Sequence, residues 1–215
     1  RVEDEYGPSV ISEFVPGPWT DILAVNLIFD KRSQLVGQFA FEKLRLCPPK
    51  TGVSVMARSI FAPELVERLL PLFAAVGWQG PADAEFKIDA ATGDARLLEI
   101  NGRFTGALAF GIDCGINFPA LYCDAAVGTA SPCDLTPRYE EGIVYWNPGL
   151  FLQSLVQDWR TSGKDWDVLK TALRQLMQMK VGNPWRLSDP APYFGKLLIE
   201  LGEKIRGDRT GGDEA

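Results

Sequence analysis

Short apolar runs separated by polar turns dominate the first 140 residues and predict β-strands. The runs 22–29 and 35–46 flank a polar turn, so they predict an antiparallel hairpin. The run 9–15 ends at Pro16-Gly17-Pro18, a sequence that stops a strand. Further strands are predicted at 53–58, 82–89 and 95–100.

The hydrophobic spacing changes to a helical period at 63–76 and at 118–127. Each of these segments has a proline in its first turn and a glycine directly after it, which are favoured helix boundaries. Beyond residue 139 the chain is rich in Leu and Trp at helical spacing. The helices predicted there are 149–160, 166–180 and 193–205.

These elements predict an α+β fold, an antiparallel sheet with flanking helices, followed by a C-terminal helical appendage. We expect three parts: a core over 1–139, a helical extension over 140–206 and a disordered polar tail over 207–215. Because the chain begins with Arg1 and runs almost at once into an apolar segment, we also expect that it is cut from a longer protein.

The amino-acid composition excludes several kinds of partner and catalytic site. The chain carries a net charge of −6 without a basic stripe and has no apolar run long enough to cross a bilayer, so we expect neither a nucleic-acid partner nor a membrane. It has no histidine, which excludes histidine triads and histidine metal sites within it. The four cysteines form no CxxC pair; we interpret them as small core residues in a reducing cytoplasm.

Two acidic strands around Thr92 can be paired by arithmetic. With Gly93 as the left-handed residue of a three-residue loop 91–93, the residue numbers of each cross-strand pair sum to 184. Glu85 then lies opposite Glu99, and Asp83 lies opposite Asn101. The other face is predicted to be buried and carries Ala84, Phe86 and Ile88 against Ile100 and Leu98.

Like charges placed directly opposite across a sheet are destabilising. A divalent cation would explain the pair: two carboxylates with the amide oxygen of Asn101 suit Mg²⁺ or Mn²⁺. The alternative is a solvated sheet face on which Glu85 and Glu99 splay apart.

The segments 80–86, 92–94 and 98–103 resemble the final hairpin of the ATP-grasp superfamily, and 111–119 resembles the segment that follows it in carboxylate–amine ligases. The resemblance covers about 10–127, the second half of such a domain. It implies that Glu85, Glu99 and Asn101 hold the Mg²⁺ or Mn²⁺ ions that bridge the ATP phosphates. It also implies that Arg103 faces the phosphates or an acyl-phosphate intermediate. Gly102 stands where the family often has proline.

The segment 10–17 is similar to the ATP-grasp hinge beside adenine, which makes Glu13, Phe14 and Val15 nucleotide-binding candidates. Asp21 lies near where the family places an acid on the ribose hydroxyls. An edge strand ended by prolines is the alternative interpretation.

Lys43 and Arg45 are two residues apart on one predicted strand, so their side chains would share a face. They could bind phosphate or a carboxylate substrate there. Solvated charges on a half-exposed strand are the alternative. The resemblance thus implies a ligase, or a fragment of one, that uses Mg-ATP to activate a small carboxylate as an acyl phosphate for attack by an amine or similar nucleophile.

No glycine-rich phosphate loop precedes Val10, and no GxxxxGK[ST] motif occurs. A truncated or degenerate ATP-grasp domain without turnover, acting as a binding module, therefore stays open. So does a plain α+β binding domain whose glutamates are surface residues, and so does a homodimer.

Overall fold

The computed structural model describes residues 7, 12–49, 52–162 and 165–182, together with positions 191, 194, 195, 198 and 199. Its strands are β1 (Ile22–Phe29), β2 (Leu35–Cys47), β3 (Val53–Ile60), β4 (Gly80–Ile88), β5 (Ala95–Asn101), β6 (Val144–Trp146) and β7 (Val181–Gly182). Its helices are α2 (Pro63–Ala75), α3 (Leu108–Asp113), α4 (Phe118–Val127), α5 (Pro148–Thr161) and α6 (Trp166–Leu176).

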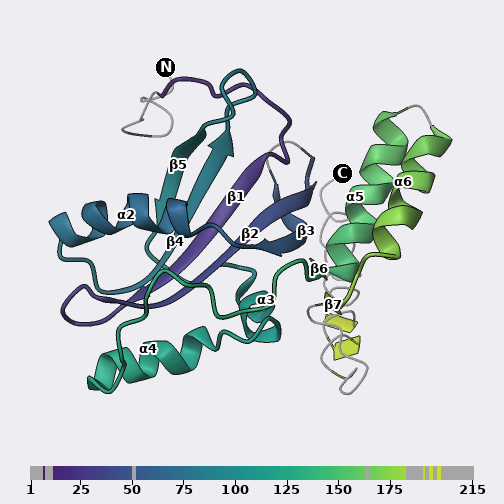
Figure 1. Ribbon diagram of the computed structural model, residues 1–215. Coiled ribbons are helices and arrows are strands. Elements are labelled where there is room, and N and C mark those ends of the chain that lie inside the picture. Colours follow the sequence, from purple (N-terminus) through teal and green to yellow (C-terminus); the bar gives the residue numbers. More distant parts are fainter. Residues whose placement is uncertain are drawn as a thin grey trace.

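The strands form one sheet in the order β5-β4-β1-β2-β3-β6-β7 (Figure 1). Neighbouring strands are antiparallel except for the last pair, β6 and β7, which are parallel. The predicted α+β class with a largely antiparallel sheet is confirmed.

The predicted strands and helices of the core occur within a few residues of their expected bounds. Helix α4 matches its prediction and ends at Gly128 with φ 87°. Three elements were missed, namely α3, β6 and β7, because each is too short to show a period. The strand predicted at 9–15 is wrong for 12–15, which lie outside regular structure, and 9–11 lie outside the described residues. The predicted helix 193–205 and tail 207–215 lie mostly or wholly outside them.

Apolar side chains project from both faces of the central strands, and each face has its own core. On one face, Phe39 and Phe41 of β2 pack with Phe110 of α3. On the other face, the strands pack against α2 through side chains such as Leu65 and Leu69. The sheet is therefore the middle layer between α2 and the pair α3 and α4.

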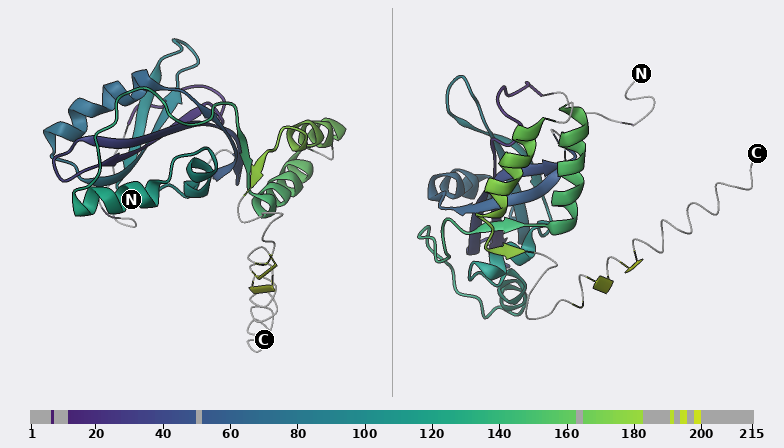
Figure 2. Two further views of the ribbon diagram at one scale, coloured as in Figure 1. Left: turned by 60° about the horizontal axis from the view of Figure 1, so that its bottom comes forward. Right: turned by 90° about the vertical axis from the view of Figure 1, so that its right-hand side faces the viewer.

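The helices of the C-terminal extension, α5 and α6, lie side by side, and α5 packs against β2 and β3 (Figures 1 and 2). A third buried cluster joins Cys47 and Met56 of the sheet to Phe151 of α5 and Ala172 of α6. The extension was predicted to be helical, and it also supplies β6 and β7 to the sheet. A domain boundary near residue 139 stays a prediction.

The acidic hairpin differs from its prediction near the turn. Asp89 and Asp94 pair through the Asp89 amide, so the loop is 90–93, one residue longer than predicted. An irregularity between Glu85 and Phe86 then places Phe86 opposite Leu97. Leu98 is the extra residue and is 48% exposed, so its predicted burial is wrong.

The bulge restores the predicted register toward the strand ends: Glu85 lies opposite Glu99 and Asp83 opposite Asn101. On the other face of this hairpin, Ala84 and Phe86 are buried as predicted, and Ile100 packs against their cluster.

The cysteines are free, as expected, but not all are core residues. Cys47 and Cys114 are buried and Cys133 is partly buried, whereas Cys123 is exposed on α4, so the core interpretation is wrong for that residue. None of the helices among the described residues is long and apolar enough to cross a bilayer.

Candidate active site

Cross-strand pairing places the acidic residues on the sheet face that α3 and α4 cover. Paired residues share a face, and Glu99, Glu85, Ala24 and Phe41 form one row across four strands. The neighbouring row holds Asn101, Asp83, Asn26 and Phe39. Because Phe39 and Phe41 contact α3, both rows belong to this face, and the carboxylates lie on its β4–β5 side.

The two opposed glutamates have different partners. Lys43 Nζ donates to both carboxylate oxygens of Glu85, each at 2.7 Å. Glu99 Oε1 accepts a hydrogen bond from Asn101 Nδ2 at 2.8 Å. Lys43 therefore supplies a counter-charge that strand pairing alone did not reveal, and the like-charge opposition does not by itself require a cation.

Asp83 is the most deeply buried carboxylate of the cluster, at 4% exposure. Its Oδ1 accepts from Asn26 Nδ2 at 2.7 Å. Desolvation, with a smaller contribution from the charge of Glu85, raises the pKa of Asp83 to about 6, although Lys43 and Arg103 act in the opposite direction. Near neutral pH this carboxylate is ionised at an energetic cost.

Asp83→Asn is expected to stabilise the protein near pH 7.5 but not at pH 4. The raised pKa means that the native state binds the proton more tightly, so wild-type stability falls as pH rises from about 4 through about 6. The asparagine avoids this loss and keeps an acceptor for Asn26, so we expect a gain of about 2 kcal/mol at the higher pH. Urea denaturation in EDTA at both pH values measures it; a difference independent of pH would contradict the assignment.

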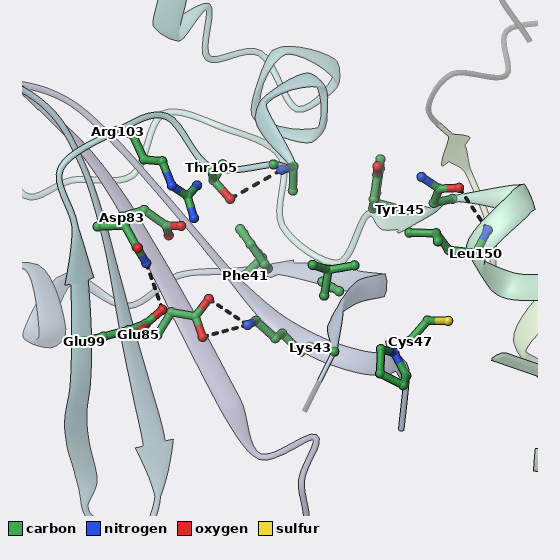
Figure 3. A pocket seen from close by; sticks show the side chains of 18 residues that line it. Phe41, Lys43, Cys47, Asp83, Glu85, Glu99, Arg103, Thr105, Tyr145 and Leu150 are labelled. Atoms are coloured by element: carbon green, nitrogen blue, oxygen red, sulfur yellow. Dashed lines mark hydrogen bonds and ion pairs between the residues drawn. The ribbon is translucent and has the colours of Figure 1, made fainter. Parts of the chain in front are cut away.

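A cavity of about 610 Å³ opens beside the carboxylates (Figure 3). Five predicted site residues line it: Lys43, Glu85, Glu99, Asn101 and Arg103. At one end of the cavity are the charged side chains of β4, β5 and the loop after β5; at the other are Cys47, Leu150 and Tyr145, with Phe41 between the two ends (Figure 3). The cavity thus has a charged end and a largely apolar end.

Several lining residues were not predicted as site residues. Thr105 lies two residues after the predicted motif, so its place in the sequence was an available signal. Asn147 and Leu150 had no such signal, because long-range contacts, among them the pairing of β6 with β3, bring the extension to the cavity.

The structure explains why a glycine stands at position 102, which the sequence did not predict. A Cβ at this position would lie 2.7 Å from the outer ring edge of Trp78, closer than real Cβ contacts allow. The side chain of Trp78 therefore occupies the space that a larger residue would need just before Arg103. Arg103 itself lines the cavity, and its Nη1 donates to the carbonyl of Phe104 at 3.0 Å.

Arg45 does not join the cavity, although it was predicted to share a face with Lys43. The β2–β3 pairing is irregular between Lys43 and Arg45 and again after Arg45, so simple alternation fails there. Arg45 is buried and donates to Ser154 at 2.6 Å, to Gln175 at 2.9 Å and to Asp158. Its role in this structure is to hold the helical extension.

The predicted hinge residues also lie outside the cavity lining: Glu13, Phe14, Val15 and Asp21. Phe14 is 70% exposed and meets Trp19 edge-on, with ring centroids 6.3 Å apart. The segment that follows packs on the far end of β4, where Lys87 Nζ donates to the carbonyl of Pro18 and the Ile88 amide donates to that of Asp21.

The polar side chains of the cavity could bind a divalent cation only if water or substrate supplied some of its ligands. Among the described residues no three acidic, histidine or cysteine side chains converge as a ready-made metal cluster. Mg²⁺ commonly uses one or two carboxylates and completes its shell with waters and substrate phosphates. Glu85, Glu99 and the Asn101 amide oxygen match that smaller set in chemistry.

No family model and no curated protein matches this sequence. Solved structures similar to part of the chain include three carboxylases and synthetases. Pyruvate carboxylase from Rhizobium etli aligns at a TM-score of 0.45 and 18% identity, over 57% of this chain and 13% of its own. Biotin carboxylase from Campylobacter jejuni aligns at 0.44 and 20%, over 56% and 28%. The N5-carboxyaminoimidazole synthetase of Staphylococcus aureus aligns at 0.44 and 14%, over 56% and 32%.

Biotin carboxylase and N5-carboxyaminoimidazole synthetase are ATP-grasp enzymes, the superfamily that the hairpin motif resembles. This chain spans at most about a third of the length of those proteins. With identities no higher than 20% and TM-scores below 0.5, the likeness concerns chain arrangement and carries no activity over to this chain.

Proposed function

We propose that the chain is the metal- and nucleotide-binding part of an ATP-dependent ligase that activates a carboxylate for attack by an amine or similar nucleophile. The observation that supports this most strongly is the convergence of Lys43, Glu85, Glu99, Asn101 and Arg103 on one cavity. Five of the ten residues that the sequence singled out, from three separate stretches of chain, therefore meet at one cavity.

The charges of the cavity suit a bound cation together with polyphosphate. Three carboxylates line it, from Asp83, Glu85 and Glu99, against the two cationic groups of Lys43 and Arg103. A divalent cation held by Glu85, Glu99 and Asn101 would offset the excess negative charge, and nucleotide phosphates would complete its coordination. Lys43 and Arg103 remain as donors for anionic groups.

Mg-ATP, when bound, supplies the phosphoryl group that turns a carboxylate into an acyl phosphate. The contribution of this chain is positioning and charge. Arg103 has a planar fork of donors suited to two oxygens of one anion. Lys43 is held in place by Glu85 and can donate to a carboxylate or phosphate when a cation takes over that glutamate.

The nucleotide base is proposed to lie beside 13–21, which contacts the end of β4 through Lys87 and Ile88. Asp83 and Glu85, which line the charged end of the cavity, then lie further back along the same strand. Glu13, Phe14, Val15 and Asp21 stay candidates for base and ribose, as backbone or exposed side-chain contacts. A homodimer and a cytoplasmic location also stay predictions.

Calorimetry with Mg-ATP tests the proposal. We expect binding by wild type and at least tenfold weaker binding by Glu99→Gln, which removes one negative ligand charge while keeping the side-chain shape. Glu67→Gln is the matched control, because Glu67 is exposed on α2 across the sheet, and its affinity should equal that of wild type. Equal affinities for all three proteins would contradict the assignment.

One observation favours a second candidate, a binding module without turnover. Both oxygens of Glu85 are engaged by Lys43, so a cation must compete with a formed ion pair. If Lys43 keeps Glu85, nucleotide binding should be the same in EDTA as in Mg²⁺. The ligase proposal expects binding to be lost in EDTA, so the same calorimetry separates the two.

A further inference from the structure

We propose that the apolar end of the cavity is the subsite for the organic part of the carboxylate substrate, and that the C-terminal extension builds it. The substrate would be an acid with an aliphatic or aromatic side chain, its carboxylate toward Lys43 and its side chain toward Leu150. This inference rests on the proposed function and deepens it by naming a substrate class.

Polarity changes along the cavity in one direction. Glu85 and Arg103 lie at the charged end, and Lys43 reaches Glu85 from the middle of the cavity, where buried Phe41 also lies (Figure 3). The opposite wall consists mainly of apolar groups from the β2 end, the β3 start and the extension: Cys47, Pro48, Val53, Tyr145 and Leu150. A ligand with one anionic and one apolar end matches this distribution.

The placement of the hinge segment argues against the nucleotide base at this apolar end. Both β4 residues that line the cavity, Asp83 and Glu85, precede Lys87 in the strand. Lys87, two residues further along, instead bonds to Pro18 of the hinge segment. A base beside that segment would lie at the Ile88 end of β4, whereas Leu150 belongs to the extension beyond β3, which leaves the apolar end to the phosphoryl acceptor.

The apolar wall is rigidly attached to the sheet. Arg45 of β2 bonds to Ser154 and Asp158 of α5, and its guanidinium lies 5.2 Å from the ring centroid of Phe151. Asn147 caps the same helix, since its Oδ1 accepts from the Leu150 amide at 3.2 Å. Leu150 is thus held in the wall by contacts on both sides, which is the preorganisation that a selective pocket needs.

The wall also offers a way to recognise a polar group on the substrate. Asn147 lines the cavity, and its capping bond uses only the amide oxygen. The amide nitrogen carries two donor hydrogens. An acid bearing one acceptor on an otherwise apolar side chain would suit this end of the cavity.

Three acids of increasing apolar size test the subsite: acetate, hexanoate and 3-phenylpropionate. Their affinities can be measured by ligand-observed saturation-transfer NMR, with Mg²⁺ and a non-hydrolysable ATP analogue present. We expect hexanoate and 3-phenylpropionate to bind at least tenfold more tightly than acetate. Leu150→Asp should weaken 3-phenylpropionate at least tenfold, and Leu150→Ala should weaken it less.

Leu152→Asp is the matched control, because Leu152 is on the same helix but is 62% exposed and does not line the cavity. Its affinities should equal those of wild type. The inference is overturned if the folded Leu150→Asp protein binds 3-phenylpropionate like wild type. It is also overturned if acetate binds as tightly as the larger acids, or if none of the acids binds.

Calorimetry with Mg-ATP shows whether only the proposed subsite is wrong or the proposed function as a whole. If only the subsite is wrong, wild type and Leu150→Asp both bind Mg-ATP and the acids show no preference. If the proposed function is wrong, wild type does not bind Mg-ATP, whatever the acids do.

Discussion

Lys43→Met is expected to destabilise the protein by about 3 kcal/mol in the absence of divalent cations, because it leaves a nearly buried carboxylate without its partner. The side chains of Lys43 and Glu85 are 8% and 19% exposed, and their ion pair is 2.7 Å long. Without the ammonium group, Glu85 faces Glu99 across the hairpin and loses the cation that directly offsets the repulsion. Urea denaturation in EDTA measures the loss.

The double variant Lys43→Met/Glu85→Gln is the control, since it removes both charges of the pair. It should recover most of the lost stability, because replacing both partners avoids an uncompensated charge. Millimolar Mn²⁺ should also restore part of the stability of Lys43→Met but not of the double variant. A single variant as stable as wild type would show that solvent, rather than Lys43, compensates Glu85.

Arg45→Ala should cost about 3 kcal/mol as well, for a different reason. The guanidinium is the main polar link between the sheet and the helical extension, and it bonds to Ser154, Asp158 and Gln175. Its removal leaves buried Ser154 short of a partner and removes the contact with the Phe151 ring. Urea denaturation followed by circular dichroism measures the change.

Arg58→Ala is the matched control on the neighbouring strand. Arg58 pairs with Glu42 at 3.1 Å, but the two side chains are 45% and 34% exposed, so less than about 1 kcal/mol should be lost. Equal losses for the two arginines would contradict the role assigned to Arg45 in holding the extension. We also expect Arg45→Ala to weaken binding of 3-phenylpropionate, because the Leu150 wall loses its anchor.

The sequence predicted the acidic hairpin correctly at its far end and wrongly at its turn. A loop longer by one residue and a bulge at Leu98 offset each other, so Glu85 still lies opposite Glu99. Alternation of apolar and polar residues could not show the bulge, because one extra residue leaves no mark in a short pattern. The pair was predicted from the position of Gly93 alone, and the prediction is correct at Glu85 because the two differences cancel there.

Other parts of the site depend on contacts between distant segments. Nothing near Lys43 in the sequence indicates that it bonds to Glu85, 42 residues away. Arg45 looked equivalent to Lys43, yet local register shifts and the extension, more than 100 residues further on, give it a structural role. The same applies to Leu150, which lies at the cavity because β6 pairs with β3 and α5 packs on the sheet.

We propose above that the acidic hairpin holds a divalent cation together with nucleotide phosphates. Electron paramagnetic resonance of Mn²⁺ with a non-hydrolysable ATP analogue tests it most directly, comparing wild type with Glu85→Gln/Glu99→Gln. We expect the spectrum of immobilised Mn²⁺ for wild type only when the analogue is present, and no such spectrum for the folded double variant. The same immobilised spectrum from both proteins, or none from wild type with the analogue, would contradict it.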